Sequence, residues 1–259
     1  MQIPFYQIDA FTSKRFAGNP AGVCPLEEWL DDETMQLIAA ENNLSETAFF
    51  VRRDSDFELR WFTPEVEVDL CGHATLASAY VLFSELGYDK TEIRFNTKSG
   101  ALSVKKEFDL LSLDFPSREG KVVTPPEGLA DSLGVEPLEV LLSRDLLVVC
   151  RSEDDVRSLK PIFSGLSRIR ALGIIATAEG THSDFVSRFF APRVGVDEDP
   201  ATGSAHCTLV PYWSRKLGKK ALHGLQVSSR GGEFFCEDLG DRVKIAGRAV
   251  KYLHGTIEI

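Results

Sequence analysis

The sequence predicts an α+β protein of two related domains, and an internal repeat is the main reason. In each half an aromatic strand ends in proline, an acidic loop follows, and a Gly-containing turn leads into an apolar helix closed by glycine. The copies begin at Trp61-Phe62-Thr63-Pro64 and at Phe189-Phe190-Ala191-Pro192. Strand-like runs surround one apolar helix in each half and do not alternate regularly with helices, which favours α+β over α/β. A chain of 259 residues can bury two modest cores.

The first predicted domain covers residues 1–115 and consists mostly of strands. Acidic residues at 31–33 open a helix that runs through Glu41, and the helix of the first repeat begins at Gly72. Glycine, asparagine and proline within residues 16–22 predict a loop. Alternating or aromatic apolar runs predict the strands, at 2–10, 47–51, 57–63, 92–97, 101–106 and 110–115.

The second predicted domain covers residues 116–249, after a turn-rich boundary at 116–120 and a proline pair at 125–126. Short helices are expected near Leu129 and at 154–159, and the helix of the second repeat follows Gly203. The strands are expected at 146–150, 173–178, 184–190, 226–229, 233–237 and 242–245. A last strand at 250–259 is expected to join the first domain.

Composition restricts the class of protein. A net charge of −10 without a clustered run of Lys and Arg argues against a nucleic-acid partner. No apolar run approaches the ~20 residues that span a bilayer, and no secretory signal is visible at the start, so we expect a cytoplasmic protein without a membrane partner. Five widely spaced cysteines without a C-x-x-C pair indicate reduced thiols.

The paired Gly-containing turns indicate where a ligand would bind. Gly72 and Gly203 each stand at a predicted helix N-terminus, where backbone N–H groups lack partners and the helix dipole is positive. If the two N-termini face each other across a cleft between the domains, they form a site for a small carboxylate. The alternative is that both turns are ordinary junctions between strand and helix that match by chance.

Three residues near these turns are candidates for chemistry. Glu46 precedes the apolar run 47–51, where low polarity would make its carboxylate a good proton carrier near neutral pH. His73 follows Gly72 and is placed to exchange a proton with a ligand, and Asp199 lies in the equivalent loop of the second repeat. The alternatives are a solvent-facing turn residue for Glu46 and a surface residue for His73. For the neighbours Asp197 and Glu198, a solvated acidic turn is the preferred interpretation.

Neither a metal nor a cofactor is expected. Cys71-Gly72-His73 and His206-Cys207 each offer two kinds of donor, but there is no H-E-x-x-H motif and no Cys/His set with zinc spacing. Phosphate-binding glycine motifs of the G-x-x-x-x-G-K-[ST] and G-x-G-x-x-G types are also missing from the sequence. A cofactor-free mechanism is the simplest inference.

Six motifs in order resemble the signature set of the PhzF-like, or phenazine-biosynthesis-like, isomerase family, and the resemblance extends from Met1 to Ile259. It is closest to the branch of phenazine biosynthesis-like domain proteins found outside phenazine producers. The motifs are Asp9-Ala10-Phe11, Gly18-Asn19-Pro20-Ala21, Asn43-Leu44-Ser45-Glu46-Thr47-Ala48-Phe49, Phe62-Thr63-Pro64, Leu70-Cys71-Gly72-His73-Ala74-Thr75-Leu76-Ala77 and Glu198-Asp199-Pro200-Ala201-Thr202-Gly203-Ser204-Ala205-His206.

The resemblance implies the fold of diaminopimelate epimerase, in which two pseudosymmetric domains each wrap a curved, mostly antiparallel sheet around a central helix. It implies that Glu46 is the general acid/base, with His73 and Asp199 close by. It also implies a substrate carboxylate held by N–H groups around Gly72, Gly203 and Ser204, and we add Ser45 to these expected substrate-binding residues. We expect a homodimer that shifts a proton on a small carboxylate-bearing metabolite.

One departure from the related racemases bears on mechanism. Cofactor-independent racemases of this fold place a cysteine before glycine in both motifs, so that one thiolate removes a proton and the opposite thiol delivers another. Here Cys71 occupies the first position and Thr202 the second, which disfavours two-thiol racemisation. An amino-acid racemase or epimerase using Cys71, and a non-catalytic ligand-binding protein, remain the alternatives.

Overall fold

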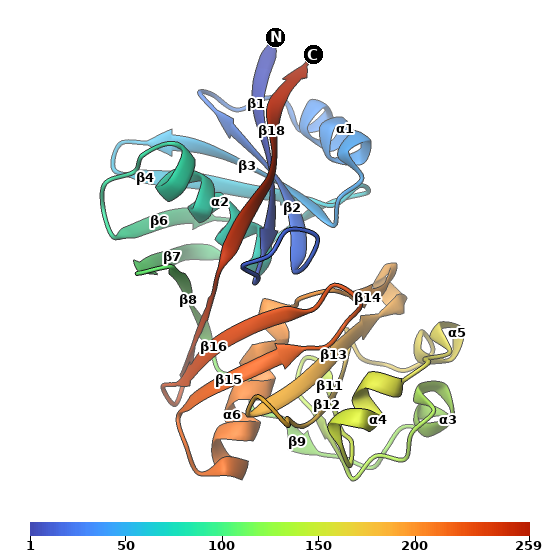
Figure 1. Ribbon diagram of the computed structural model, residues 1–259. Coiled ribbons are helices and arrows are strands. Elements are labelled where there is room, and N and C mark those ends of the chain that lie inside the picture. Colours follow the sequence, from blue (N-terminus) through green and yellow to red (C-terminus); the bar gives the residue numbers. More distant parts are fainter. The chain divides into compact units, whose positions relative to one another are not determined.

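The computed structural model describes residues 1–259, and the chain forms two compact units (Figure 1). The first unit contains Met1–Asp114 and Ala246–Ile259, and the second contains Phe115–Ile245. The last strand therefore belongs to the first unit. It lies beside the first strand, so the two termini are neighbours in Figure 1.

The sheet of the first unit is mostly antiparallel. Its strands pair in the order β18-β1-β2-β3-β4-β6-β7-β8, with the short β5 also beside β4. Only two joins are parallel, β2 with β3 and β4 with β6, and a helix connects each of these pairs, as a parallel crossover requires. The strands are β1 (Gln2–Ala10), β2 (Asn19–Leu26), β3 (Glu46–Arg53), β4 (Asp56–Phe62), β5 (Glu67–Val68), β6 (Glu92–Thr97), β7 (Gly100–Glu107), β8 (Leu110–Pro116) and β18 (Ala249–Glu258).

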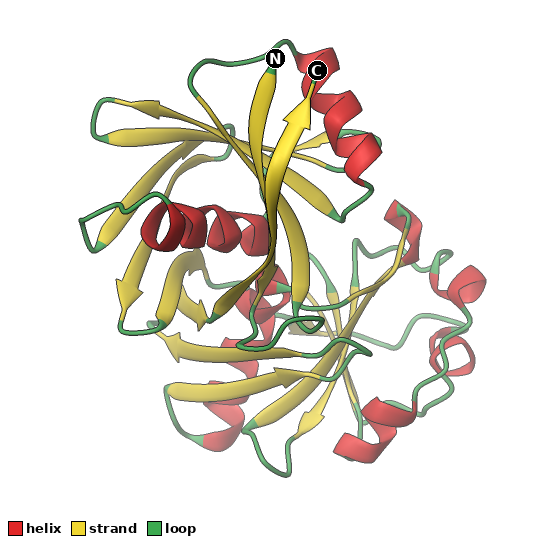
Figure 2. Cartoon of the chain, turned by 45° about the horizontal axis from the view of Figure 1, so that its top comes forward, coloured by secondary structure: helices red, strands yellow, loops and turns green.

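Two helices occupy opposite faces of this sheet. Helix α2 (Gly72–Tyr80) continues as a π-helical turn, η1 (Val81–Glu85), and its residues 73–79 are all buried inside the curved sheet (Figure 2). Helix α1 (Asp32–Asn42) lies on the outer face, where Met35 and Ile38 cover an apolar cluster. It begins because the carboxylate of Asp31 accepts a hydrogen bond from the Thr34 N–H.

The strands of the second unit repeat this design and pair in the order β9-β10-β11-β12-β13-β15-β16, with β14 beside β13 and β17 beside β16. Helices α3 (Leu129–Leu133), α4 (Glu153–Ser158) and α5 (Phe163–Leu166) cover one face, and α6 (His206–Leu217) packs against β15 and β16. The strands are β9 (Lys121–Val122), β10 (Glu139–Leu142), β11 (Leu146–Val149), β12 (Ile174–Glu179), β13 (Phe185–Ala191), β14 (Val196–Asp199), β15 (Ala221–Gln226), β16 (Gly232–Asp238) and β17 (Arg242–Gly247).

The sequence repeat corresponds to a repeated topology. In the first unit β4 is followed by the short β5, by α2 and by β6, which lies parallel to β4. In the second, β13 is followed by the short β14, by α6 and by β15, which lies parallel to β13. Gly87 and Gly218, both with positive φ, follow the two helices. The predicted fold class is confirmed: each repeat is a curved, mostly antiparallel sheet around one helix.

Two sequence predictions were wrong at this level. Residues 16–22 are not entirely loop, because β2 begins at Asn19 and pairs with β1 through residue 23; only Phe16 and Gly18 take the left-handed conformation of a turn. The strand expected at 226–229 instead ends at Gln226. The following residues turn, and the Ser228 hydroxyl donates to the Pro200 carbonyl at 2.7 Å. Tertiary contacts override local propensity in both places.

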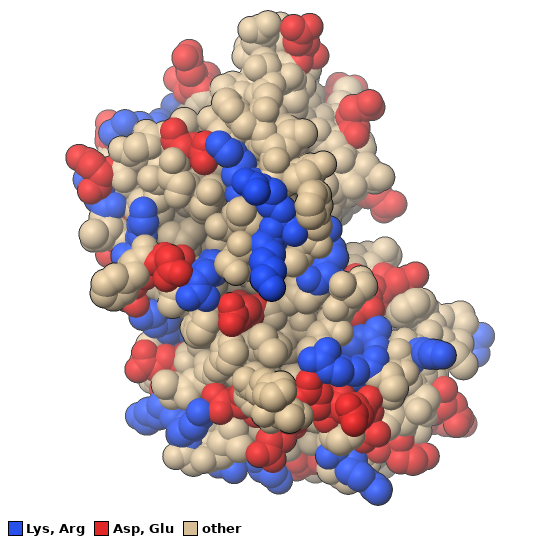
Figure 3. Space-filling model, in the orientation of Figure 1, with Lys and Arg blue, Asp and Glu red and all other residues tan.

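Charge is unevenly distributed over the surface. On the face shown in Figure 3, Lys and Arg side chains gather in a band over the first unit, whereas acidic and basic side chains are interspersed over the second. None of the helices combines the length and apolar character needed to span a membrane.

Candidate active site

Glu46 is positioned by a parallel strand pair. It is the first residue of β3 and lies opposite Ala21 of β2. The strand behind it is apolar and buried from Thr47 to Val51, which fixes the backbone of Glu46 at the edge of the core. Its side chain is only 19% exposed, and the Oε2 atom of its carboxylate is buried. The alternative of a solvent-facing turn residue was therefore wrong.

His73 meets Glu46 from the N-terminus of α2. The imidazole Nε2 lies 3.0 Å from Glu46 Oε2, and the His73 side chain is only 7% exposed. Its other nitrogen, Nδ1, lies 3.3 Å from Asn19 Nδ2 and 3.5 Å from Cys71 Sγ. Because Cys71 is the N-cap of the same helix and Asn19 begins β2, three separate segments hold one imidazole ring. His73 is not a surface residue, and that alternative was wrong too.

The expectation that low polarity would bring the pKa of Glu46 toward neutrality was wrong, because its polar neighbours keep it an ionised carboxylate. Burial raises the pKa of Glu46, but the charge of His73 and the close polar contacts of His73 and Cys71 outweigh burial and lower the pKa overall. Burial lowers the pKa of His73, yet Cys71 and Glu46 raise it well above its usual value. Burial and the Glu46 carboxylate raise the pKa of the Cys71 thiol to about 11. Since that thiol is neutral near pH 7, the Glu46 carboxylate is the charge that keeps the proton on His73.

The pair has unused hydrogen-bonding capacity. Glu46 Oε2 and His73 Nε2 are buried and close, but neither makes an aligned hydrogen bond within the protein. Buried polar atoms without such bonds are costly, and each calls for an explanation such as a catalytic role or a bound group. A polar ligand group that hydrogen-bonds to Glu46 and His73 would offset this cost.

The same residues form the one group of candidate metal donors. The donor atoms of Glu46, Cys71 and His73 lie within 4.8 Å of one another, although they come from two separate segments of the sequence. The Cys71 thiol contacts Nδ1 of the His73 imidazole, and the Glu46 carboxylate contacts Nε2 of the same ring. One ion bonds only one ring nitrogen, so all three side chains could hold it only if the imidazole turned. The arrangement suits proton exchange better than metal binding.

A second polar cluster surrounds Asp199 in the other repeat. Asp199 ends β14, and its carboxylate accepts a short hydrogen bond from the Thr202 hydroxyl. The Gln226 amide nitrogen donates to the Asp199 carbonyl at 2.6 Å and to Thr202 Oγ1 at 3.1 Å, while its oxygen accepts from the Thr202 N–H at 2.8 Å. Gly232 permits this close packing, because a Cβ there would lie 2.7 Å from Ala201 Cβ. The loop is therefore rigidly held.

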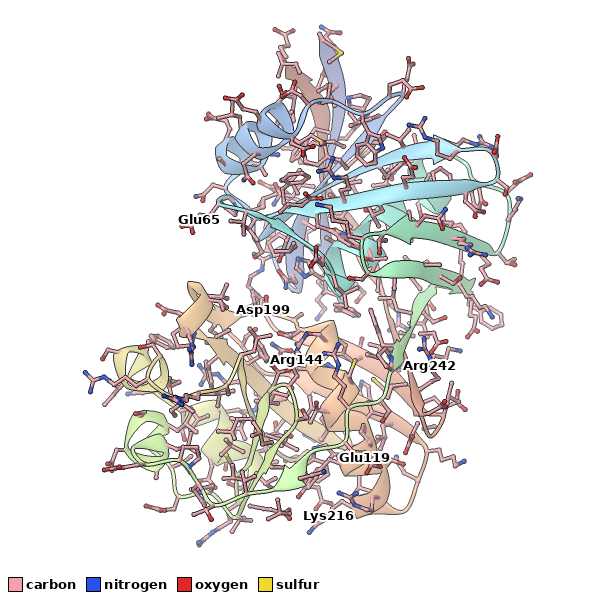
Figure 4. All side chains as sticks on the ribbon, turned by 180° about the vertical axis from the view of Figure 1, so that it is seen from behind. Glu65, Glu119, Arg144, Asp199, Lys216 and Arg242 are labelled. Carbon is pink, nitrogen blue, oxygen red and sulfur yellow. The ribbon has the colours of Figure 1, made fainter.

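Ser204 and Gly203 form the first turn of the helix that follows. They belong to the short 3₁₀ turn η3 (Gly203–Ala205), which leads into α6. Ser204 Oγ accepts a hydrogen bond of 3.0 Å from Arg144, which Figure 4 shows in the same part of the second unit as Asp199. His206 is fully buried and its pKa is lowered to about 4, mainly by burial. It is a neutral core residue that donates through Nδ1 to the Thr202 carbonyl at 2.9 Å.

The structure thus brings Glu46 and His73 together in one cluster, and Asp199, Gly203 and Ser204 into another. Ser45 precedes Glu46 and is exposed. The interpretation of Glu198 as a solvated residue was wrong, because it forms a two-pronged ion pair with Arg188 at 2.7 and 2.8 Å.

The sequence analysis missed three residues of these clusters. Asn19 carried a signal, since it belongs to a Gly-Asn-Pro motif, but it was assigned to a loop. Gln226 and Arg144 are isolated in sequence from the residues that they contact. No local pattern identifies them.

Comparison with known proteins agrees with this description. Residues 8–255 match the family model described as phenazine biosynthesis-like protein. An uncharacterised isomerase of Pseudomonas aeruginosa is 50% identical over the full length of both chains. The crystal structure of a phenazine biosynthesis protein of the PhzF family from Enterococcus faecalis is 44% identical, with a TM-score of 0.99 and full coverage of both chains. A hydroxyproline epimerase from Agrobacterium vitis shares the fold alone, at 10% identity and a TM-score of 0.63 over 99% of this chain and 92% of that one.

The repeated sheet-and-helix design and these relatives define an isomerase of the epimerase-like fold. Proteins of that fold differ widely in sequence, so the family is identified by the sequence match that extends along the chain. The chain belongs to the phenazine biosynthesis-like, or PhzF, family.

Proposed function

We propose that this isomerase moves a proton between two atoms of a small carboxylate-bearing metabolite, with Glu46 as the proton carrier. The observation that carries the proposal is the contact of 3.0 Å between Glu46 Oε2 and His73 Nε2. The lowered pKa keeps Glu46 ionised, and its buried Oε2, which makes no aligned hydrogen bond within the protein, leaves an acceptor position for a proton from a ligand.

The chemistry balances without an added reactant. The Glu46 carboxylate takes a proton from one substrate atom, the electron pair left behind shifts along the conjugated substrate, and the resulting carboxylic acid returns the proton to a second atom. The His73 imidazolium keeps Glu46 ionised before the first transfer. It can also hydrogen-bond the negative charge that develops on the substrate.

We propose that helix N-termini bind the substrate carboxylate. The first N–H groups of α2, from Gly72 onward, have no intrahelical acceptors, and the dipole of the helix favours an anion at that end. Asp199, Gly203 and Ser204 are proposed as further substrate contacts, with Asp199 held in place by Thr202. The expectation that both repeats contribute to one site stays a prediction.

Racemisation by two thiols is the weaker candidate. It needs a thiolate at Cys71, whose pKa is raised to about 11, and a second proton carrier at position 202. The Thr202 hydroxyl donates its proton to Asp199 instead. The contact between Cys71 and His73 is the one observation in favour of a role for this thiol.

The test is a screen of small carboxylates in heavy water, scored by mass for enzyme-dependent deuterium uptake without added metal or cofactor. Glu46→Gln should abolish uptake almost completely, and His73→Asn should reduce it less, because His73 assists the transfer without carrying the substrate proton. Uptake by no carboxylate, or uptake that persists in Glu46→Gln, would reject the proposal. The same preparations allow light scattering to test our proposal of a homodimer, with twice the mass of the 28.7 kDa chain.

A further inference from the structure

A pocket lies within the second unit, at the end of its sheet where β11 and β12 begin. Its volume is about 640 Å³. Three chain segments line it: the turn between β10 and β11, the segment that enters β12, and the 3₁₀ turn η2 (Pro192–Val194) that follows β13. Its main lining side chains are three arginines and three apolar residues, Arg144, Arg170, Arg193, Leu142, Leu172 and Val194.

Strand pairing explains why these segments meet. β11 and β12 are parallel and start at the same end of the sheet, where Leu146 pairs with Ile174. β13 is antiparallel to β12 and ends there, since Ile174 pairs with Phe190. The arginines therefore project from adjacent strand ends, although they are far apart in the sequence. Their convergence is a property of the fold.

The arginines differ in how their charges are balanced. Arg144 is paired with the fully buried Asp145 at 3.0 Å and also donates to Ser204. Arg170 and Arg193 are exposed and make neither an ion pair nor a side-chain hydrogen bond. No acidic side chain lines the pocket. In a chain with a net charge of −10, the pocket thus carries two uncompensated positive charges.

We propose that this pocket binds a phosphate monoester with an apolar body. A phosphate monoester carries a charge near −2 at neutral pH, which matches two free guanidinium groups, and its oxygens accept the paired N–H bonds that arginine offers. Leu142, Leu172 and Val194 expose apolar surface on the same pocket and would cover the apolar body. The site does not include Glu46, and it stands whether or not the proposed isomerase mechanism is right.

Calorimetry with simple probes tests the site on the full chain. Phenyl phosphate is the probe, and inorganic phosphate and phenol supply the charge and the apolar body separately. Phenyl phosphate should bind at least fivefold more tightly than inorganic phosphate, and phenol should not bind measurably. Equal affinity for phenyl phosphate and inorganic phosphate would overturn the apolar part of the proposal, and no binding of phenyl phosphate would overturn all of it.

Variants locate the binding. Arg170→Gln and Arg193→Gln should each weaken phenyl phosphate binding at least tenfold, because each removes a charged, two-pronged donor. Arg168→Gln is the matched control, since Arg168 is an exposed arginine of the neighbouring turn that does not line the pocket. Arg144 is left intact because it also contacts Ser204. Both pocket variants should keep the parent's deuterium uptake. Phenyl phosphate binding that survives in the variant carrying both Arg170→Gln and Arg193→Gln would belong to another anion site and would overturn the proposal.

Discussion

The decisive perturbation is Glu46→Gln, which keeps the shape of the side chain and removes its ability to carry a proton. Loss of a positioned acid/base lowers turnover by about 10²–10⁴. At 1.36 kcal/mol for each tenfold change, this is a rise of about 2.7–5.4 kcal/mol in the barrier. Ligand affinity should change little. In the parent, the negative carboxylate of Glu46 and the positive imidazolium of His73 have a total charge of zero. In the variant, the amide is neutral and no longer keeps the proton on His73, so the total charge of the pair is again zero.

The assay is deuterium exchange into a substrate from the screen, measured together with the dissociation constant of the same substrate. Glu65→Gln is the matched control, because Glu65 is an exposed glutamate of the same unit, labelled in Figure 4, whose side chain makes neither a hydrogen bond nor an ion pair. It should exchange at the parent rate. Equal exchange rates for Glu46→Gln and the parent would refute the mechanism, and a large loss of affinity in a folded Glu46→Gln would refute the charge argument.

Three further predictions concern Cys71, the pH dependence of the Glu46–His73 pair, and the loop of the second unit that carries Asp199. Cys71→Ser should leave exchange within about tenfold of the parent, an effect of ~1.4 kcal/mol or less, whereas a loss of thousands-fold would restore the thiol mechanism. The stability contributed by Glu46, whose pKa is lowered, should be present above about pH 4.3 and be lost as the pH falls through its folded pKa. The contribution of His73, whose pKa is raised, should be complete below about pH 6.5 and be lost as the pH rises through its folded pKa. Urea unfolding of parent and His73→Asn across this range checks the sign, and a difference that grows with pH would contradict it. Gly232→Ala should lower the free energy of unfolding by about 1–3 kcal/mol, because its methyl group would press on Ala201; an unchanged urea midpoint would show that the loop yields easily.

The sequence predicted the fold well because local signals and tertiary structure agree in the repeats. The strand at 92–97 and the helix that α1 forms from Asp32 were found from periodicity and end signals alone. One error lies where residues with turn chemistry join a sheet, from Asn19 onward, and the other where an expected strand after Gln226 is a turn. Asn19 has a poor strand propensity, but its backbone pairs with β1 and its amide reaches His73, so its place depends on the fold as a whole.

The candidate site was only partly predictable for the same reason. Glu46 and His73 are 27 positions apart, and their contact follows from β3 and α2 meeting in one unit. Local sequence indicated which residue types are present, and the resemblance to the PhzF-like family indicated that Glu46 and His73 lie close together. Gln226 and Arg144 could not be found, because an isolated polar residue at a strand end or turn is usually on the surface.

The return of β18 to pair with β1 along most of their length has a consequence for biosynthesis. During translation residues 1–114 emerge first, yet β1 lacks one neighbour until residues 249–258 have left the ribosome. The second unit is continuous in sequence, so all of its strands have left the ribosome before β18 does. We therefore expect the later-emerging unit to complete its fold first, while the edge of β1 stays exposed to pairing with other nascent chains.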